Sequence, residues 1–268
     1  MPSPMQPIER VRAPSILDHG LHLRWSLPLL VLLALLPAIA HGLGEDFYIG
    51  VASRVLIFAL AATSLNLILG FGGMVSFGHA AFVGIGAYTV GILMQSGIAS
   101  AWVAWPAAFV LGGLFACVIG LISLRTQGVY FIMITLAFAQ MAYYVFISAR
   151  SLGGDDGLPL AGRMTLAGVP LTDDTNLYFA AFFGLTVAML FFGRLADARF
   201  GRVIQAIREN ETRMEALGYP VFTYRLVCFA LGGALAGLAG ALLANLTGLA
   251  SPNLLQWMQS GTLLVMVI

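Results

Sequence analysis

Few side chains in this sequence could carry out chemistry, and one common reactive type is missing. All thirteen Lys-plus-Arg residues are arginine, so the chain contains no lysine. A Walker A loop needs Gly-Lys-Ser/Thr to hold nucleotide phosphates, and Schiff-base catalysis needs a lysine amine, so both are excluded. Any ATP that drives this protein must therefore be hydrolysed on another chain.

The residues of a metal or catalytic site are not found at useful spacing either. His79 is the only histidine within an apolar run, and no Cys, Asp or Glu stands at ligand spacing from it. A hydrogen-bonded core histidine is therefore expected, rather than a metal ligand. Cys117 and Cys228 lie inside apolar runs, where cysteine usually packs as a small hydrophobic residue. With no nucleophile beside a base and no acidic pair, we expect a non-enzymatic chain without a cofactor of its own.

The composition is that of a membrane protein. Of the 268 residues, 60% are hydrophobic and only 9% are charged, and the mean hydropathy is +0.93. A soluble domain of this length would carry roughly 67 charged residues. At about 20 residues per span, the apolar content suffices for seven or eight membrane-spanning helices. The net charge of +1, with no basic tract, argues against nucleic acid as a partner.

Uninterrupted apolar runs place these helices along the chain. The expected fold class is all-α: a polytopic α-helical membrane protein with about eight spans, the last of which is cut short. We expect residues 1–25 to form a cytoplasmic leader, although the run up to Ala40 also resembles a cleavable signal peptide. The expected spans are residues 27–40, 47–69, 75–94, 101–124, 129–149, 177–193 and 222–247, with an eighth from about residue 254.

Two of these spans carry small residues at helical spacing, which lets backbones approach closely where lipid gives no hydrophobic drive. Close helix packing is the favoured interpretation of both stripes. Their members are Ala104, Ala108, Gly112, Ala116 and Gly120 in one span, and Gly233, Gly237 and Ala241 in the other.

The arginines predict the orientation, because basic loop residues are rarely translocated across the membrane. With the N-terminus inside, ten arginines are cytoplasmic or at that boundary. Only Arg150 and Arg163 lie outside, and Arg54 falls within a span. The sequence therefore predicts a cytoplasmic N-terminus.

Glycine and polar residues gather in the third span and its entry. The entry, Gly70-Phe71-Gly72-Gly73, has high backbone freedom, and the span mixes glycine with Ser, His, Tyr and Thr. Loose backbone at membrane depth is tolerated only when it is buried in protein or faces a water-filled cavity. This pattern predicts a wall of a transport path, with close helix packing as the alternative. The candidate path residues, including polar ones from other spans, are Arg54, Asn66, Ser76, Gly78, His79, Gly84, Gly86, Tyr88 and Gln140.

The long cytoplasmic loop of residues 194–220 predicts an amphipathic helix that ends near Gly218. Its apolar face consists of Val203, Ile207, Met214 and Leu217. Glu209 and Arg213 are spaced as an i,i+4 pair on the other face, and Glu211 is expected to be exposed. Three Arg balance three Glu in this helix, whereas anionic lipid favours basic faces. Docking in a groove of another protein is therefore preferred to docking on the membrane surface.

Three motifs in this order resemble the branched-chain amino acid ABC importer permeases, specifically the LivM-type subunit. Residues 201–218 read Gly-Arg-x-x-x-Ala-Ile-Arg-Glu-Asn-Glu-x-x-x-Glu-Ala-Leu-Gly and are similar to the cytoplasmic loop of that family. Residues 66–88 resemble its glycine-rich signature. Residues 126–140, followed by 153–158, resemble its central span and external loop. The resemblance covers residues 47–268, so residues 26–268 are expected to form the permease domain.

The resemblance implies partners and a role for the loop. The partners would be a second, related permease subunit, two ATPase subunits that hold ATP and Mg, a periplasmic substrate-binding protein, and membrane lipid. The loop helix would be the element that couples this chain to an ATPase. Its candidate coupling residues are Arg202, Val203, Ala206, Ile207, Arg208, Glu209, Asn210, Met214, Glu215, Ala216, Leu217 and Gly218.

The implied substrates are leucine, isoleucine and valine, and the implied location is the bacterial inner membrane. Permeases of the same architecture for urea, short amides or other amino acids are an alternative. An ion-coupled secondary transporter is less favoured, because such carriers keep a carboxylate within the membrane. The expected spans contain no Asp or Glu.

Each of three polar residues within the spans has two possible interpretations. Arg54 either snorkels to the outer surface or faces the path, where it could meet a substrate carboxylate or an acid on a partner subunit. Asn66 and Gln140 are expected to be buried amides that either bind a neighbouring helix or line the path.

Overall fold

The computed structural model describes residues 23–43, 47–160, 162–166, 169–171 and 173–268, and these residues are mainly helical. The N-terminal leader therefore lies almost entirely outside the described residues. The helices in chain order are α1 (Leu23–Leu43), α2 (Phe47–Asn66), α3 (His79–Gln95), α4 (Ala101–Ser123), α5 (Val129–Ser148), α6 (Asp174–Asp197), α7 (Arg199–Glu209), α8 (Glu211–Ala216), α9 (Val221–Thr247) and α10 (Trp257–Val267).

The chain is a polytopic helical membrane protein. Among the described residues, five helical stretches are long and apolar enough to cross a membrane, and three shorter apolar helices accompany them. The first of the five is α2 together with the π-helical turn η1 (Leu67–Phe71), which extends it to 25 residues. The others are α4, α5, α6 and α9.

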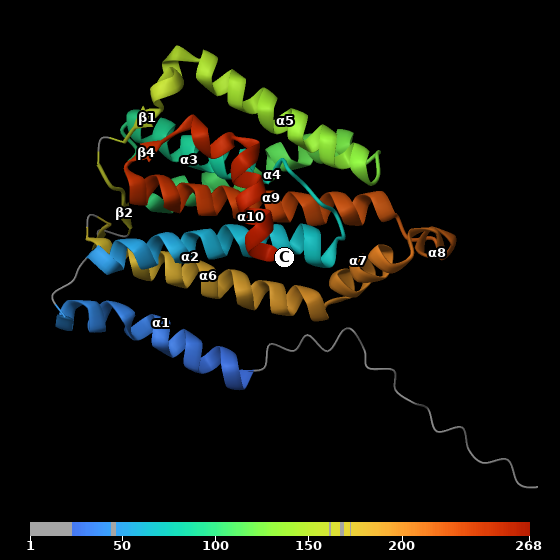
Figure 1. Ribbon diagram of the computed structural model, residues 1–268, viewed down its shortest axis with the longest axis horizontal. Helices are drawn as coiled ribbons and strands as arrows, with labels where there is room; N and C mark the ends of the chain where they lie inside the picture. Colours follow the sequence, from blue (N-terminus) through green and yellow to red (C-terminus); the bar gives the residue numbers. More distant parts are fainter. Residues whose placement is uncertain (1–22, 44–46, 161, 167–168, 172) are drawn as a thin grey trace, which may run out of the picture.

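Helix α9 is the centre of the bundle. In an apolar stretch of 18 residues within α9, 72% of the residues are buried. The buried share of the corresponding stretches in α5 and α6 is 22%. It packs on α4, α3 and α2, and Figure 1 shows its axis running alongside those of α2 and α6. An apolar helix that is buried nearly all round needs small residues wherever its neighbours approach closely.

Both predicted stripes of small residues are confirmed as packing surfaces. The five residues of the α4 stripe are buried against α9. A Cβ added at Gly112 would lie 2.7 Å from the carbonyl oxygen of Gly233, and one added at Gly237 would lie 2.5 Å from that of Ala108. These positions accept no side chain, because the facing atoms belong to a helix backbone.

Two short antiparallel strand pairs lie at one end of the bundle, and α7 and α8 lie at the other (Figure 1). One pair joins β1 (Leu158–Pro159) to β4 (Leu249–Ala250), and the other joins β2 (Thr165–Leu166) to β3 (Val169–Pro170). The β1–β4 pair ties the loop after α5 to the end of α9. The 3-10 turns η2 (Arg150–Leu152) and η3 (Gly154–Asp156) complete that loop.

Two predicted spans begin later than the apolar pattern indicated. Helix α3 starts at His79 rather than Val75, because hydroxyl groups take up the preceding amides: Gly78 N donates to Ser76 Oγ, and Phe77 N donates to Thr135 Oγ1. Helix α10 starts at Trp257, after the 3-10 turn η4 (Pro252–Leu255).

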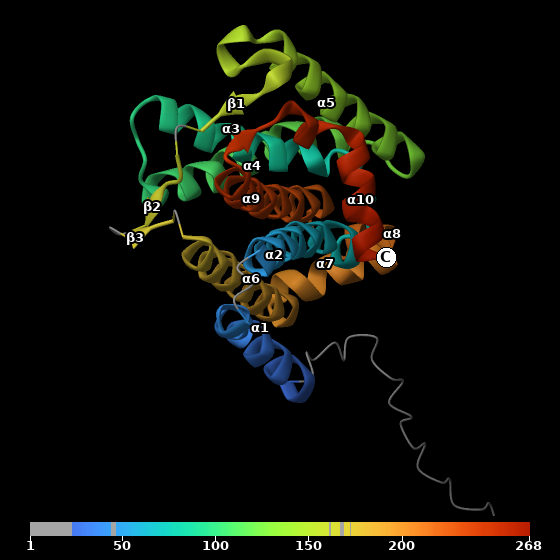
Figure 2. The same ribbon diagram turned by 60° about the vertical axis from the view of Figure 1, so that its left-hand side comes forward.

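Helix α10 runs in a different direction from α2 and α9. Figures 1 and 2 both show it crossing steeply over the direction of α2 and α9, and it contacts α2, α3 and α5. The predicted eighth apolar segment is thus present as the short apolar helix Trp257–Val267.

Candidate functional site

The loop between α6 and α9 folds as two helices, so the prediction of one continuous amphipathic helix is wrong. Asn210 adopts an extended conformation, with φ −155° and ψ 98°, between α7 and α8. Its side-chain oxygen accepts a hydrogen bond of 2.9 Å from Arg213 N and so caps α8. This break removes the helical spacing on which the predicted Glu209–Arg213 pair depended. Gly218, with φ +84°, follows α8 in the left-handed conformation that commonly ends helices.

The break also changes which side chains are buried. Ile204, Ile207 and Met214 are buried against the rest of the chain, whereas Val203 is half-buried. Leu217, predicted on the buried face, is 65% exposed. The exposed residues of this element among the candidates are Arg202, Arg208, Glu209, Asn210, Glu215, Ala216, Leu217 and Gly218, while Ala206 is half-buried.

An ion pair fixes α8 to the bundle. Glu211 Oε1 lies 2.7 Å from the guanidinium of Arg225 in α9, and its other oxygen accepts a 2.9 Å hydrogen bond from Gln127 before α5. The expectation that Glu211 is a freely exposed residue is therefore wrong. Periodicity could not reveal this contact, because both partners are remote in the sequence.

Helix α7 is joined directly to the glycine-rich entry of the third span. The guanidinium of Arg208 donates a hydrogen bond to the carbonyl oxygen of Gly70, in η1. The stem of Arg208 packs against Gly73, where an added Cβ would lie 2.8 Å from Arg208 Cγ. Gly73 has a φ of +66°, a conformation that side chains disfavour. These contacts of Arg208 connect α7 to the backbone between α2 and α3.

That backbone is held by five fully buried polar residues, which we call the polar cluster: Ser64, Ser76, His79, Thr135 and Ser260. Thr135 and Ser76 accept the hydrogen bonds of 3.3 and 3.2 Å from the amides of Phe77 and Gly78. Ser260 Oγ accepts a 2.9 Å hydrogen bond from Ala80 N, and Ser64 Oγ lies 2.8 Å from His79 Nε2. The cluster therefore joins α2, α3, α5 and α10 around irregular backbone.

The structure brings three of the nine predicted path residues into this region. Ser76 and His79 belong to the polar cluster, and Gly78 lies between them. An added Cβ at Gly78 would lie 2.8 Å from the carbonyl oxygen of Thr135, which explains the glycine there.

The other predicted path residues lie elsewhere. Gly84 and Gly86 pack against Leu255 and Gly237, and buried Tyr88 has its ring 4.4 Å from that of Phe146. Gln140 is half-buried, and its Oε1 has no hydrogen-bond partner among the described residues.

Two candidates lie on the outside of this chain. Asn66, expected as a buried amide, is exposed, and its side chain lies over Gly70, where an added Cβ would overlap Asn66 Oδ1. Arg54 is also exposed, on the same helix as exposed Val51 and Val55. It lines no enclosed space of the described chain, and the surface it occupies is open to lipid or to another subunit.

Sequence reasoning missed Ser64, Thr135, Ser260 and the pair of Glu211 with Arg225. A lone hydroxyl in an apolar run carries no positional signal, because serine and threonine can satisfy themselves by bonding to their own helix. Ser64 and Thr135 also do this, donating to Ala61 and Ile132. Only the tertiary fold shows that their oxygens also serve α3.

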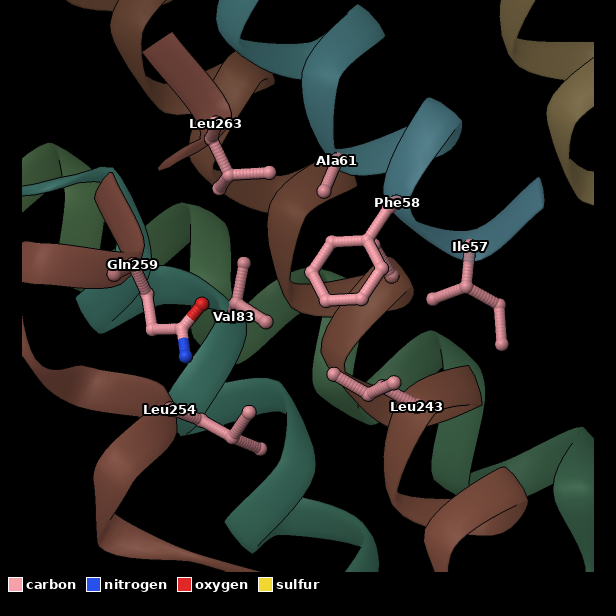
Figure 3. A pocket seen from close by; sticks show the side chains of 10 residues that line it. Ile57, Phe58, Ala61, Val83, Leu243, Leu254, Gln259 and Leu263 are labelled. Carbon is pink, nitrogen blue, oxygen red and sulfur yellow. The ribbon is translucent and has the colours of Figure 1, made fainter. Parts of the chain in front are cut away.

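An apolar cleft lies beside the polar cluster, between α2, α3, α9 and α10 (Figure 3). Nine of the ten residues that line it are apolar, and the tenth is Gln259. Its volume is about 10 Å³, room for about one water molecule. The described residues bring no three His, Cys, Asp or Glu side chains together as metal ligands.

The chain is similar to known permease proteins. Residues 47–268 match the family described as branched-chain amino acid transport system / permease component. The chain is 25% identical to the LivM permease protein of the high-affinity branched-chain amino acid transport system of Salmonella typhimurium, and 24% identical to that of Escherichia coli. Each alignment covers 82% of this chain and 57% of the relative. A probable LivM permease protein of Methanocaldococcus jannaschii is 24% identical over 69% of this chain and 64% of its own length. No solved structure matches the chain significantly.

Proposed function

Because the chain belongs to the family of permease components of branched-chain amino acid transport systems, we propose that it is a membrane-spanning permease subunit of an ATP-driven importer of leucine, isoleucine and valine. The chain spans a little over half the length of the curated bacterial relatives it matches. The observation that carries the proposal is the α7–α8 element, which joins an exposed surface at one end of the bundle to irregular backbone within it.

The proposed partners follow from what this chain must obtain elsewhere. With no lysine, it cannot form a Walker A site, so two separate ATPase subunits bind ATP and Mg. A second, related permease subunit completes the membrane part, and a periplasmic binding protein delivers the substrate. The exposed Arg54 surface of α2 is suited to the second permease, because a charge within a span is costly when it faces lipid.

The proposed orientation puts the α7–α8 end in the cytoplasm and the strand end in the periplasm of a bacterial inner membrane. Arg199, Arg202, Arg208 and Arg213 lie within α7 and α8, and basic residues are retained on the cytoplasmic side. This end is also the one that an ATPase can reach.

Coupling would proceed through a short chain of contacts. The exposed surface at the C-terminal end of α8, with Leu217 and Tyr219 just after the helix, docks in a groove of the ATPase. Closure of the ATPases then displaces α7, and Arg208 passes this movement to Gly70 and Gly73. Residues 75–78, between these glycines and α3, have no helical secondary structure, so they are the part of the path that we expect to move.

Replacing Leu217 with Asp is expected to weaken ATPase docking at least about tenfold, because it would bury an unpaired carboxylate in the groove. Leu217 is 65% exposed in this chain, so the substitution leaves its own core intact. The measurement is co-purification of the ATPase with the membrane complex, after membrane insertion has been verified.

Thr212→Asp provides the matched control, because it adds the same charge to an exposed position at the start of α8, where an acidic residue is favourable. Its complex should retain the ATPase. Wild-type retention of the ATPase by the Leu217→Asp chain would count against docking at this surface.

A further inference from the structure

Two helices begin at the same place within the bundle. The N-terminal ends of α3 and α10 meet where Ala80 N donates to Ser260 Oγ, and segments without α-helix, residues 72–78 and 248–256, precede them. The place lies at membrane depth, because the cleft beside it is lined by Ile57 and Ala61, near the middle of the 25-residue span of α2. Helix N-termini carry partial positive charge, and paired at this depth they favour an anionic group.

The apolar cleft adjoins this meeting point. Ala80 lines the cleft and also belongs to the first turn of α3, and Gln259 of the cleft precedes Ser260. Figure 3 shows the ring of Phe58 projecting between Val83 and Leu243, with the Gln259 carboxamide on the opposite side of Val83. One end of the site is therefore apolar, and the other is polar.

His79 provides a second observation, independent of the helix ends. The hydroxyl of Ser64 donates to the Ala61 carbonyl over 2.6 Å, so the 2.8 Å contact with His79 Nε2 requires the imidazole to donate there. Nδ1 of a neutral His79 is then a bare acceptor, and this fully buried atom has no partner among the described residues. A buried acceptor of this kind can be satisfied by a donor on a ligand, such as an ammonium group.

We propose that this cleft and the polar cluster form a substrate-binding site for a small aliphatic amino acid in transit. This assignment rests on the proposed function. The cleft receives the branched side chain. The N-terminal ends of α3 and α10 receive the carboxylate, and Nδ1 of His79 accepts a hydrogen bond from the ammonium group. A volume of about 10 Å³ is too small for a leucine side chain, so Phe58 and α10 must move apart for the site to fill.

The apolar end can be tested by changing its size in opposite directions. In the complete reconstituted importer, Phe58→Ala should raise the ratio of leucine to valine uptake at least about threefold, and Val83→Leu should lower this ratio. The reason is that an apolar pocket distinguishes substrates that differ by one methylene group. Each amino acid is supplied with saturated binding protein. Val55→Ala, on the exposed face of α2, should leave the ratio unchanged.

The polar end can be tested by charge. Gln259→Glu should reduce leucine uptake at least about tenfold, because its carboxylate competes with that of the substrate. Complex assembly is verified for each variant by co-purification. An unaltered ratio in Phe58→Ala and Val83→Leu, or full uptake by Gln259→Glu, would overturn the site. If the wild-type complex carries no branched-chain amino acid, the proposed function itself is wrong.

Discussion

Replacing Gly240 with alanine is expected to destabilise the helix bundle by about 3 kcal/mol, the upper part of the range for overpacked cores. An added Cβ would overlap the carbonyl of Val83, and backbone atoms of α3 cannot rotate away as a side chain would. Helices α3 and α9 would have to separate at the centre of the protein. The effect is measured as a lower midpoint of thermal unfolding in detergent, with a reduced yield of monodisperse protein.

Gly184→Ala is the matched control, since it adds the same methyl group to another helix of the bundle. There the nearest atom to the new Cβ is a leucine methyl at 3.7 Å, which is ordinary contact. Alanine also favours helix over glycine by about 1 kcal/mol, so this variant should be neutral or slightly stabilised. Equal unfolding midpoints for the Gly240 and Gly184 variants would contradict the close approach of α3 and α9.

Replacing Arg208 with alanine is expected to lower substrate uptake at least about tenfold while the ATPase remains bound. The change removes the hydrogen bond to Gly70 and the packing against Gly73, which together connect α7 to the backbone before α3. It leaves Leu217 and the rest of the exposed α8 surface in place. The measurements are ATPase co-purification, ATP hydrolysis and uptake in the same proteoliposomes, and hydrolysis should continue without matching uptake.

Arg199→Ala removes the same charge from an exposed position of the same helix and should transport normally. If both variants transport alike, the contact of Arg208 with Gly70 has no part in coupling. If Arg208→Ala loses the ATPase instead, its role is in docking rather than in transmission.

The helix packing was predictable because its signal is local and repeated. Small residues every four positions in α4 imply a close partner, and the glycines of α9 supply one. Composition and apolar runs likewise predicted most spans to within a few residues. What they could not predict was the start of α3, because that depends on hydroxyls of Thr135 and Ser76 capturing backbone amides.

In the loop between α6 and α9, helical periodicity does not predict which residues are buried. The helical pattern of the loop continues through Asn210, yet asparagine prefers to cap a helix, and its side chain does so here. Because the helix is broken at Asn210, Leu217 is exposed rather than buried, and Ile204 is buried although the pattern did not place it on the apolar face. The ion pair of Glu211 with Arg225 depends on how α8 folds back onto α9, which no spacing within the loop reports.

For the candidate path residues, the sequence could not separate those that belong to a buried polar cluster from those that serve helix packing. Ser76 and His79 belong to one buried cluster, whereas Gly84 and Gly86 serve helix packing and Asn66 is exposed. Glycine at a close approach and glycine beside a path look the same in a sequence, and only the facing atoms distinguish them.

We propose above all that this chain couples ATP hydrolysis on partner subunits to import of branched-chain amino acids. Uptake of labelled leucine into proteoliposomes that contain the two permeases and the ATPases, with loaded binding protein on the side opposite to ATP, tests it most directly. We expect uptake that requires ATP, fails without this chain, and is reduced by unlabelled isoleucine or valine but not by urea. Leucine uptake driven by an ion gradient without ATP, or ATP-driven uptake of urea in place of leucine, would contradict the account.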